Sequence, residues 1–526
     1  MNGDRNRRLL WPLVLVVATS LLLGSISLIY PFGRDQGIHA FIAEAMLSGK
    51  VVYRDVFNIK PPLTTIVHAT ALILFGHSMT AIRILDLLWT VATALAVFAF
   101  ASRAFRSRWV GAAAGCLYPL SYFPLGYWYT AQTDGWINLP VVAALLLFVL
   151  AYGRTAKQPR LLWLGSGVCC GLAMLLKYTI GLLPLLLLFI LPFAYGPRLR
   201  GAAISAAWLL LGVLVPLVSC ALVLLASGAM PAFIDSQLGL VPAYAAIGRN
   251  VGLQTRFDSF LATFTLTPEL RLPALMLAAG ALAAAVMYLR RPDWRLVLLL
   301  LASWLVVAFV STFSQGKFFV YHFLPFLPVS ALAGGLLVDI IFARLGRTRL
   351  PAAVGLGALL FVVSGFPSRF GSLMRILIGR ESVRSYWVSD LHNMASDFSL
   401  HDNVELADYL RQTTLPTDRV FIWGFEPGVY FLAGRGTVTR FLYNFPMIAS
   451  YDPQRFRAEF MRTFVHDPSE LFVVEHRDAT PWTTGSKNDS YAFLHEFPEL
   501  LEFLEARYSP DTSLGRFDVF RLAAQP

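Results

Sequence analysis

The sequence has few charged residues for its length. Only 14% of its 526 residues are charged, whereas 56% are hydrophobic. Soluble domains carry about 25% charged residues, so this composition excludes a chain that is soluble along most of its length. Apolar runs of bilayer-spanning length recur from Leu9 to about Gly365. The sequence therefore predicts an integral membrane protein followed by a soluble region.

Cysteine is scarce, and no convincing glycine-rich nucleotide loop is found. All four cysteines lie in apolar segments, at Cys116, Cys169, Cys170 and Cys220. Residues 367–526 contain none, which excludes a disulfide framework or a metal–thiolate site in the soluble region.

Acidic residues are scarce in the apolar part. Residues 1–366 hold 27 of the 43 basic residues but only 11 of the 32 acidic ones. This basic excess belongs to short loops between apolar segments, so it does not indicate nucleic-acid binding. The basic clusters are Arg5/Arg7/Arg8, Arg103/Arg106/Arg108, Arg154/Lys157/Arg160, Arg198/Arg200, Arg290/Arg291/Arg295 and Arg344/Arg347/Arg349. By the positive-inside rule the N-terminus and the other five basic loops are cytoplasmic.

Eleven membrane helices satisfy this loop pattern. They are expected at 9–29, 78–101, 109–128, 134–153, 161–177, 179–195, 202–226, 262–289, 296–313, 323–343 and 351–366. Pro62–Gly76 is too short to span, so the loop 31–77 is expected to carry two interfacial helices. An odd number of spans places the C-terminus outside the cytoplasm. The predicted domains are a transmembrane domain, 1–366, and an extracytoplasmic domain, 367–526.

The C-terminal region alternates helical and strand patterns. "NVELADYLRQTT" predicts a helix, "DRVFIWG" a buried strand, "EPGVYFLAGR" a turn with a short helix, and "ELFVVEHR" another strand. The alternation predicts a small α/β layer. The predicted fold class is thus a polytopic α-helical membrane protein of about 11 spans with a C-terminal α/β domain.

Seven of the eleven acids in residues 1–366 are expected at the outer face, where each needs a reason because acids near a bilayer are costly. Asp35 and Asp134 each stand where a helix N-cap is expected. A cap position also favours the ionised carboxylate, so a cap residue can serve as a base.

Three lysines are expected on the same face. Lys60 precedes two prolines, Lys177 stands between two apolar runs, and Lys317 lies in "SQGKFFVYHFLPFLP". Each is compatible with simple snorkelling, but together they indicate a cationic pocket for a lipid phosphate. Tyr321 and His322 fit either an interfacial belt or the lining of that pocket.

These residues resemble a known group. "RDQGIHAFIAEAMLSGKVVYRDVFNIKPPLTTIVHATALILFG" is similar to the first outer loop of bacterial GT-C glycosyltransferases, which include the lipid A aminoarabinose transferase, the lipopolysaccharide-core galacturonosyltransferases and the protein O-mannosyltransferases. The likeness continues through "TDGW", "GLAMLLKYTIGLLPL" and "GKFFVYHFLPFLP". It covers about 340 residues.

The resemblance implies site roles. Asp35 matches the catalytic base, Asp134 the second acid and Lys60 the lysine that holds the lipid phosphate. Many members have Asp-Glu at the first position, but Gln36 follows Asp35 here, so a role for that glutamate does not carry over. Asp55 belongs to the loop pattern and is assigned a structural or sugar-contacting role.

The reaction that the resemblance implies is sugar transfer from a polyprenyl-phosphate donor, with inversion, to an envelope glycan, glycolipid or protein at the outer face of a bacterial cytoplasmic membrane. No metal site is assigned and no metal is obligatory, although two carboxylates and a phosphate are compatible with a divalent cation. Two alternatives stay open, a lipid-linked sugar transporter or flippase and a non-catalytic scaffold. A transporter is expected to show midplane charges and internal repeats, which this sequence lacks.

Overall fold

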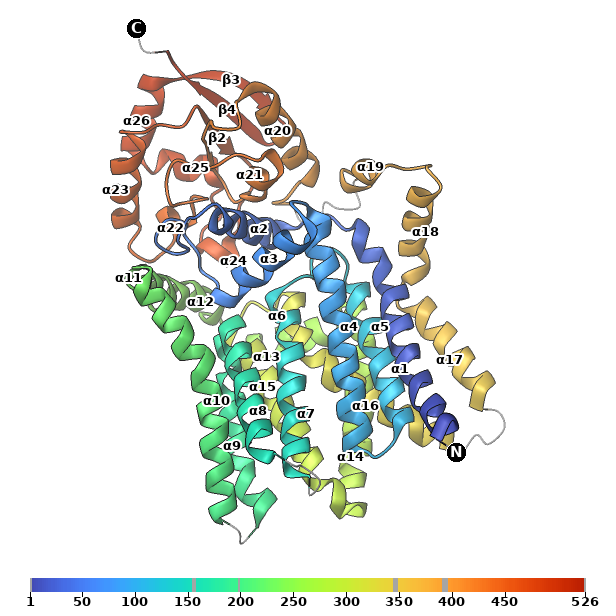
Figure 1. Cartoon of the computed structure of the whole chain (residues 1–526). Helices are drawn as coiled ribbons and strands as arrows, with labels where there is room; N and C mark the ends of the chain where they lie inside the picture. The colour runs from blue at the N-terminus through green and yellow to red at the C-terminus, as the bar shows by residue number, and fades with distance from the viewer. Residues whose placement is uncertain (1, 154–157, 197–198, 344–348, 390–395, 525–526) are drawn as a thin grey trace. The chain divides into compact units, whose positions relative to one another are not determined.

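The computed structural model describes residues 2–153, 158–196, 199–343, 349–389 and 396–524. The chain forms two compact units (Figure 1). The first contains residues 1–30, 80–220 and 252–378, and the second contains 31–79, 221–251 and 379–526. The second unit therefore joins the first predicted outer loop to the C-terminal region. The domain boundary near residue 366 stays a prediction.

The first unit is a bundle of long helices that lie side by side (Figure 1). Its α-helices and short η-helices are α1 (Asn2–Gly24), η1 (Ser25–Ile29), α4 (Met79–Ala104), α5 (Arg108–Tyr122), η2 (Phe123–Leu125), α6 (Thr133–Trp136), α7 (Asn138–Tyr152), α8 (Pro159–Leu176), η3 (Tyr178–Gly181), α9 (Leu182–Tyr195), most of α10 (Leu199–Ala226), α13 (Leu253–Leu266), α14 (Pro268–Arg290), η5 (Pro292–Trp294), α15 (Arg295–Gln315), η6 (Val320–Phe326), α16 (Leu327–Ala343), α17 (Arg349–Val363) and α18 (Phe366–Leu377).

These helices make the chain a multi-pass membrane protein. Within the described ranges, nine helical segments are long and apolar enough to span a bilayer, and α17 with α18 forms a tenth candidate bent by 77°. The expected span 109–128 is the shorter helix α5. Helix α3 (Pro62–Phe75) has 14 residues, which agrees with its expected failure to span. Among the predicted cytoplasmic cations, Arg154, Lys157, Arg198, Arg344 and Arg347 lie outside the described residues.

The second unit combines short helices with a small sheet. Its further elements are α2 (Arg34–Leu47), α11 (Met230–Ile234), the π-helix η4 (Asp235–Leu240), α12 (Val241–Arg249), α19 (Val383–Trp387), α20 (Leu400–Thr413), β1 (Val420–Trp423), α21 (Gly428–Ala433), α22 (Phe445–Ile448), α23 (Pro453–Phe464), β2 (Leu471–Glu475), α24 (Pro481–Thr484), α25 (Ser490–His495), α26 (Pro498–Arg507), β3 (Tyr508–Leu514) and β4 (Phe517–Leu522).

The C-terminal sheet confirms the predicted α/β layer. Its strand order is β1-β2-β4-β3. Strands β1 and β2 are parallel, with Phe421 opposite Phe472, whereas β4 is antiparallel to both β2 and β3. Every residue of β1 and β2 is buried, as expected for strands covered on both faces. Helices α20 and α21 and strands β1 and β2 coincide with the four predicted elements.

Helix α2 is buried more completely than its sequence pattern predicts. It packs against α3 on one side and α21 on another. Against α21, a Cβ atom on Gly37 would lie 2.7 Å from the Cα of Gly428, and Phe41 stacks on Tyr430 with ring centroids 4.9 Å apart. His39 is 4% exposed. Two packing partners therefore bury more of α2 than the single apolar face expected of an interfacial helix.

Helices α8 and α10 contact each other backbone to backbone. A Cβ atom on Gly167 would lie 2.0 Å from the Leu209 carbonyl oxygen, and one on Gly212 would lie 2.1 Å from that of Leu164. Small residues at such a crossing allow membrane helices to approach closely. The separation of α8 and α10 is therefore set by these glycines.

We predict that Gly167→Ala destabilises the protein, because the added methyl group must push α8 and α10 apart. Overpacking of this kind costs about 1–3 kcal/mol, measured as a lower unfolding temperature in detergent. The matched control is Gly357→Ala on α17, where an added Cβ meets nothing within 4 Å and alanine favours the helix. Equal unfolding temperatures for the two variants would contradict the prediction.

Candidate active site

Asp35 lies in the first turn of α2, two positions after the observed N-cap. The cap residue is Gly33, whose backbone N–H donates to Oε1 of Gln36 at 3.1 Å. The prediction that Asp35 caps the helix is therefore wrong, because α2 begins at Arg34 with Gly33 as its N-cap. The side chain of Asp35 is 27% exposed and does not cap the helix. Its carboxylate still benefits from the positive end of the helix dipole.

Lys60 is the cation beside Asp35. The Lys60 Nζ lies 3.9 Å from Oδ2 of Asp35, and each side chain is 27% exposed. The Lys60 segment is fixed locally, since its N–H donates to Asn58 Oδ1 at 2.9 Å and its carbonyl accepts from the Tyr53 hydroxyl at 2.7 Å. The structure thus brings together a carboxylate and an ammonium group that both remain accessible.

Two tyrosine hydroxyls from distant parts of the second unit lie near Asp35. Burial raises the pKa of Tyr244 and of Tyr443, and the negative charge of Asp35 raises both further. Phe445 contacts both rings, with centroid distances of 5.7 Å to Tyr244 and 6.0 Å to Tyr443. Both phenols therefore stay protonated and can act as hydrogen-bond donors. No local sequence signal pointed to them.

The Asp55 side chain forms hydrogen bonds within the loop that contains it. Its carboxylate accepts from the Val51 N–H at 2.9 Å and from Nε of Arg54 at 2.8 Å. These bonds, led by the one from Arg54, lower the pKa of Asp55 to about 2. The contacts are those of a structural residue, and a sugar-contacting role for Asp55 stays a prediction.

Asp134 and Lys177 form a buried ion pair in the first unit. Asp134 lies in the first turn of α6, whose N-cap is Gln132, so the predicted capping role of Asp134 is also wrong. Lys177 is the C-cap of α8, and its Nζ donates to Oδ1 of Asp134. The side chains are 13% and 4% exposed for Lys177 and Asp134. The pair therefore joins two helix ends that lie 43 positions apart in sequence.

Asp86 supports this helix end and was not predicted as a site residue. On α4, its Oδ1 accepts from the Tyr122 hydroxyl at 2.7 Å and from Nε1 of Trp136 at 2.9 Å. Trp136 belongs to α6, the helix that carries Asp134. Its partners on α5 and α6 lie 36 and 50 positions away in the sequence, so no local pattern could indicate them.

Lys317, Tyr321 and His322 lie at another break between helices. The chain leaves α15 at Gly316, in the left-handed conformation, and enters η6, which packs against α6. Lys317 is half-buried, whereas Tyr321 and His322 are buried and in edge contact, with ring centroids 4.7 Å apart. The backbone carbonyl of His322 accepts from Thr312 at 2.6 Å. Their phosphate-binding and pocket-lining roles stay predictions.

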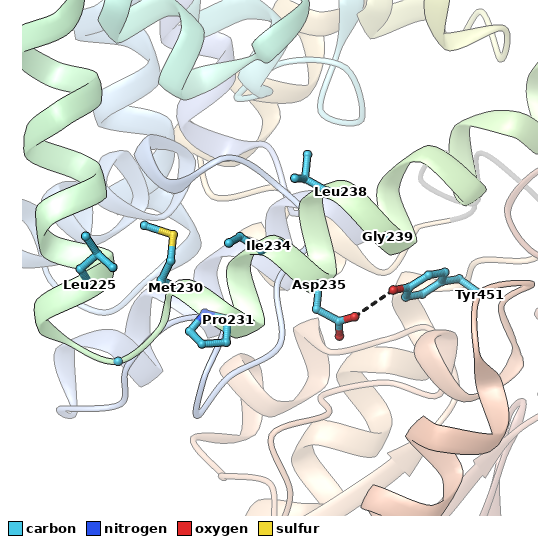
Figure 2. A pocket seen from close by; sticks show the side chains of 9 residues that line it. Leu225, Met230, Pro231, Ile234, Asp235, Leu238, Gly239 and Tyr451 are labelled. Atoms are coloured by element: carbon cyan, nitrogen blue, oxygen red, sulfur yellow. Dashed lines mark hydrogen bonds between the residues drawn. The ribbon is translucent and has the colours of Figure 1, made fainter.

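An open pocket of about 840 Å³ in the second unit involves other residues (Figure 2). It is lined by the end of α10, α11, η4 and Tyr451. Asp235 is its carboxylate, which accepts from the Tyr451 hydroxyl at 3.0 Å and pairs with Arg455 at 2.8 Å. This carboxylate is therefore engaged, and the described lining residues include none of the predicted site residues.

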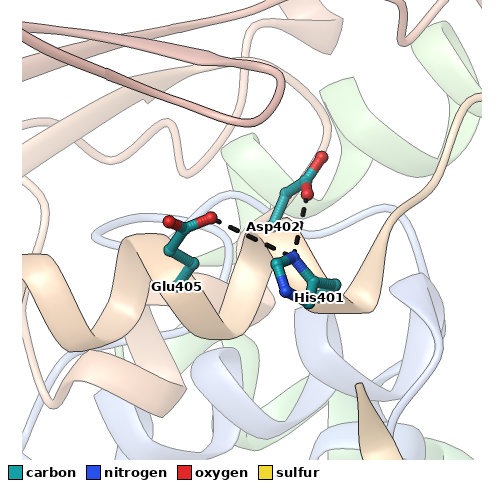
Figure 3. Close-up of side chains that lie close together, drawn as sticks. All are labelled: His401, Asp402 and Glu405. Carbon is teal, nitrogen blue, oxygen red and sulfur yellow. Dashed lines mark hydrogen bonds and ion pairs between the residues drawn. The ribbon is translucent and has the colours of Figure 1, made fainter. Parts of the chain in front are cut away.

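One acidic cluster of the described residues has the composition of a metal site. His401, Asp402 and Glu405 lie together on α20 (Figure 3). Nδ1 of His401 is 3.3 Å from Asp402 and 4.0 Å from Glu405. Asp402 also pairs with the buried Arg516 at 3.3 Å. An arginine at this position opposes cation binding, so the cluster fits a divalent ion poorly.

Comparisons with known proteins agree with the fold. Residues 59–225 match the family model of dolichyl-phosphate-mannose-protein mannosyltransferase. This range includes Lys60, Asp134 and Lys177, but Asp35 precedes it. No curated protein matches the chain by sequence.

Solved structures share the architecture over almost the whole chain. ArnT from Cupriavidus metallidurans bound to undecaprenyl phosphate is 15% identical, with a TM-score of 0.59 and coverage of 96% of this chain and 97% of that one. The Archaeoglobus fulgidus oligosaccharyltransferase with Zn and sulfate is 14% identical, with a TM-score of 0.55 and coverage of 96% and 72%. The same organism's AglB with an inhibitory peptide and a dolichol-phosphate is 14% identical, with a TM-score of 0.52 and coverage of 88% and 69%. The GT-C resemblance is confirmed in the fold.

We predict that Lys177→Met destabilises the protein more than Asp134→Asn/Lys177→Met does. The single substitution leaves a buried carboxylate without its cation, which costs about 3–5 kcal/mol, whereas the double substitution removes both charges. The measurement is a double-mutant cycle of unfolding temperatures. Arg419→Gln, which removes a surface pair with Asp467, is the control and should change stability by about 1 kcal/mol or less. A double variant no more stable than Lys177→Met would refute the pairing.

Proposed function

We propose that the protein is a glycosyltransferase that moves a sugar from a polyprenyl-phosphate donor to an envelope acceptor. The observation that carries the proposal is the Asp35–Lys60 pair, a carboxylate and an ammonium group 3.9 Å apart and both partly exposed. Sugar transfer from a lipid phosphate needs a base at the acceptor hydroxyl and a cation at the departing phosphate. Both groups must lie around one anomeric carbon, the base on the side of the acceptor and the cation on the side of the phosphate.

In the proposed reaction, the Asp35 carboxylate takes the proton of the acceptor hydroxyl. The hydroxyl oxygen forms a bond to the anomeric carbon while the bond from that carbon to the phosphate oxygen breaks. Lys60 stabilises the negative charge that collects on the leaving polyprenyl phosphate. A single displacement of this kind inverts the anomeric configuration.

The remaining predicted residues have supporting roles in this proposal. Asp134, which Lys177 holds in an ion pair, is assigned the role of second acid that the resemblance implies. Lys317, with Tyr321 and His322, is assigned to the lipid-phosphate and substrate surroundings. Asp55 is assigned to the shape of the loop that carries Lys60.

The proposed chemistry needs no obligatory metal. Chelation of divalent cations with EDTA is therefore expected to leave sugar transfer intact.

The relatives support the donor class. One solved neighbour is bound to undecaprenyl phosphate and another to a dolichol-phosphate, while the matching family model describes a dolichyl-phosphate-mannose-dependent enzyme. A lipid-linked donor also suits a multi-pass membrane protein, because the isoprenoid tail can stay in the bilayer.

We further propose that the protein lies in a bacterial cytoplasmic membrane, with the N-terminus inside and residues 367–526 outside.

We predict that Asp35→Asn lowers sugar transfer by about 10²- to 10⁴-fold, the usual contribution of a general base. The assay uses purified protein in lipid, radiolabelled polyprenyl-phosphate sugars and cell-envelope extract as acceptor. The control is Glu44→Gln on the same helix, where the acid pairs with His77 at 2.9 Å, and it should retain activity. Equal transfer by Asp35→Asn would exclude the base role. Movement of the donor across the bilayer without transfer would favour the transporter alternative.

A further inference from the structure

Arg34, the residue directly before Asp35, is held by the C-terminal part of the second unit. Its Nε donates to Oε1 of Glu426 at 2.8 Å, and its Nη1 donates to Oδ2 of Asp397 at 2.7 Å. Its Nη2 donates to the Asp397 backbone carbonyl at 2.6 Å. All three nitrogens of the guanidinium group are therefore bonded, which fixes both its position and its plane.

The contact is buried and enclosed by aromatic rings. The Arg34 side chain is 12% exposed, and those of Asp397 and Glu426 are 4% and 1% exposed. The guanidinium carbon lies 5.8 Å from the ring centre of Phe398 and 5.9 Å from that of Phe425. Rings at this distance add a cation–π attraction. Solvent therefore screens these ion pairs only weakly.

The carboxylates that receive Arg34 are themselves anchored. Asn403 on α20 donates to the other oxygen of Glu426 at 2.7 Å. The N–H of Phe425 donates to Glu475, the last residue of β2, at 2.8 Å. A Cβ atom on Gly424 would lie 2.4 Å from that glutamate oxygen, so the turn after β1 fits tightly against β2. The contact thus connects the start of α2 to the C-terminal sheet.

Charge balance makes this arrangement depend on Arg34. Burial raises the pKa of Glu426, and burial together with the nearby Asp478 and Glu426 raises that of Glu475. The positive charge of Arg34 opposes both shifts. Burial would lower the pKa of Arg34, but the carboxylates of Glu426 and Asp397 outweigh it and raise that pKa. Removing Arg34 leaves buried acids without their cation, which is costly.

These bonds also distinguish between two roles for Arg34, which are binding the donor phosphate and holding the protein's own structure. An arginine that binds phosphate needs free N–H groups and an accessible side chain. Each nitrogen of the Arg34 guanidinium already donates to the protein, and the side chain is 12% exposed, whereas Lys60 is 27% exposed. Arg34 therefore serves the protein's own structure.

We propose that Arg34 is a positioning residue for Asp35, so that the C-terminal α/β domain takes part in the chemical step by fixing the direction of the base. This inference rests on the proposed function of Asp35. The Arg34 contacts with the C-terminal region on one side of Asp35 and the Gln36 cap on the other hold the first turn of α2. A base attached to a turn held at both ends keeps its alignment with the acceptor hydroxyl, and such alignment is a large part of catalysis.

The first test compares Arg34→Gln and Glu426→Gln with wild type in the sugar-transfer assay. Both variants should lower kcat by about 10- to 100-fold per folded molecule, as expected for a misplaced reacting group. KM for the polyprenyl-phosphate donor should stay unchanged, because Tyr53 and Asn58 hold the Lys60 segment. Glu426→Gln keeps the Asp397 contacts, so it serves where Arg34→Gln fails to fold. Unchanged kcat in a folded variant would overturn the inference.

The control for a merely structural effect is Arg435→Gln. Arg435 is 7% exposed, and its Nε donates to the hydroxyl of Thr414, just after α20, at 2.8 Å, so its loss should lower stability in the same region. Its kcat per folded molecule should match that of wild type. An equal fall of kcat in Arg435→Gln would show that any damage to the C-terminal region has this effect, and would overturn the inference.

The second test repeats Arg34→Gln in the Asp35→Asn background. If Arg34 acts through Asp35, the double variant should differ from Asp35→Asn by about threefold or less, since residues that act as a unit are non-additive. A full additional loss would overturn the inference while leaving Asp35 as the base. Wild-type transfer by Asp35→Asn alone would refute the proposed base and the inference with it.

Discussion

The hydrocarbon of a bilayer offers no hydrogen-bond partners, and this constraint governs where the polar chemistry lies. Backbone groups in that solvent must be satisfied within the segment, so each span is a helix. Polar side chains then collect where helices begin, end or break. Asp35 and Asp134 lie in first turns, Lys177 caps the end of α8, and Lys317 lies between α15 and η6. The candidate site residues share positions at helix ends although they come from different parts of the sequence.

The approximate positions of the helix ends could be predicted from the sequence. The lengths of the apolar runs and the basic loops located most spans. Charged residues are rare in this chain, so those at the ends of the spans could be recognised as candidate site residues. The pattern could not place the caps to the residue, because Gly33 and Gln132 take the cap positions and only the folded turns decide this. Asp35 and Asp134 each lie two positions after the observed cap, so they are first-turn residues whose carboxylates pair with Lys60 and Lys177.

Contacts between residues far apart in the chain were the second feature that the sequence could not predict. Arg34 meets Asp397 and Glu426, which lie 363 and 392 positions further along the chain. Periodicity and propensity are local properties, so they carry no information about such partners. The Lys177–Asp134 pair and the Tyr443 hydroxyl near Asp35 belong to the same class. Residue types could therefore be predicted for the site, whereas the partners that orient them required the fold.

The second unit is assembled from three stretches of chain, 31–79, 221–251 and 379–526, and this has a consequence for biosynthesis. Helix α2 leaves the ribosome early, but Asp397 follows Arg34 by 363 residues. At a translation rate of about 5–20 residues per second, Asp397 is synthesised roughly 20 to 70 s after Arg34. During that interval α2 has no α21 to cover it, so this surface is open to chaperones and proteases. A chain that stops before residue 397 can thread all its membrane spans and still never complete the turn that carries Asp35.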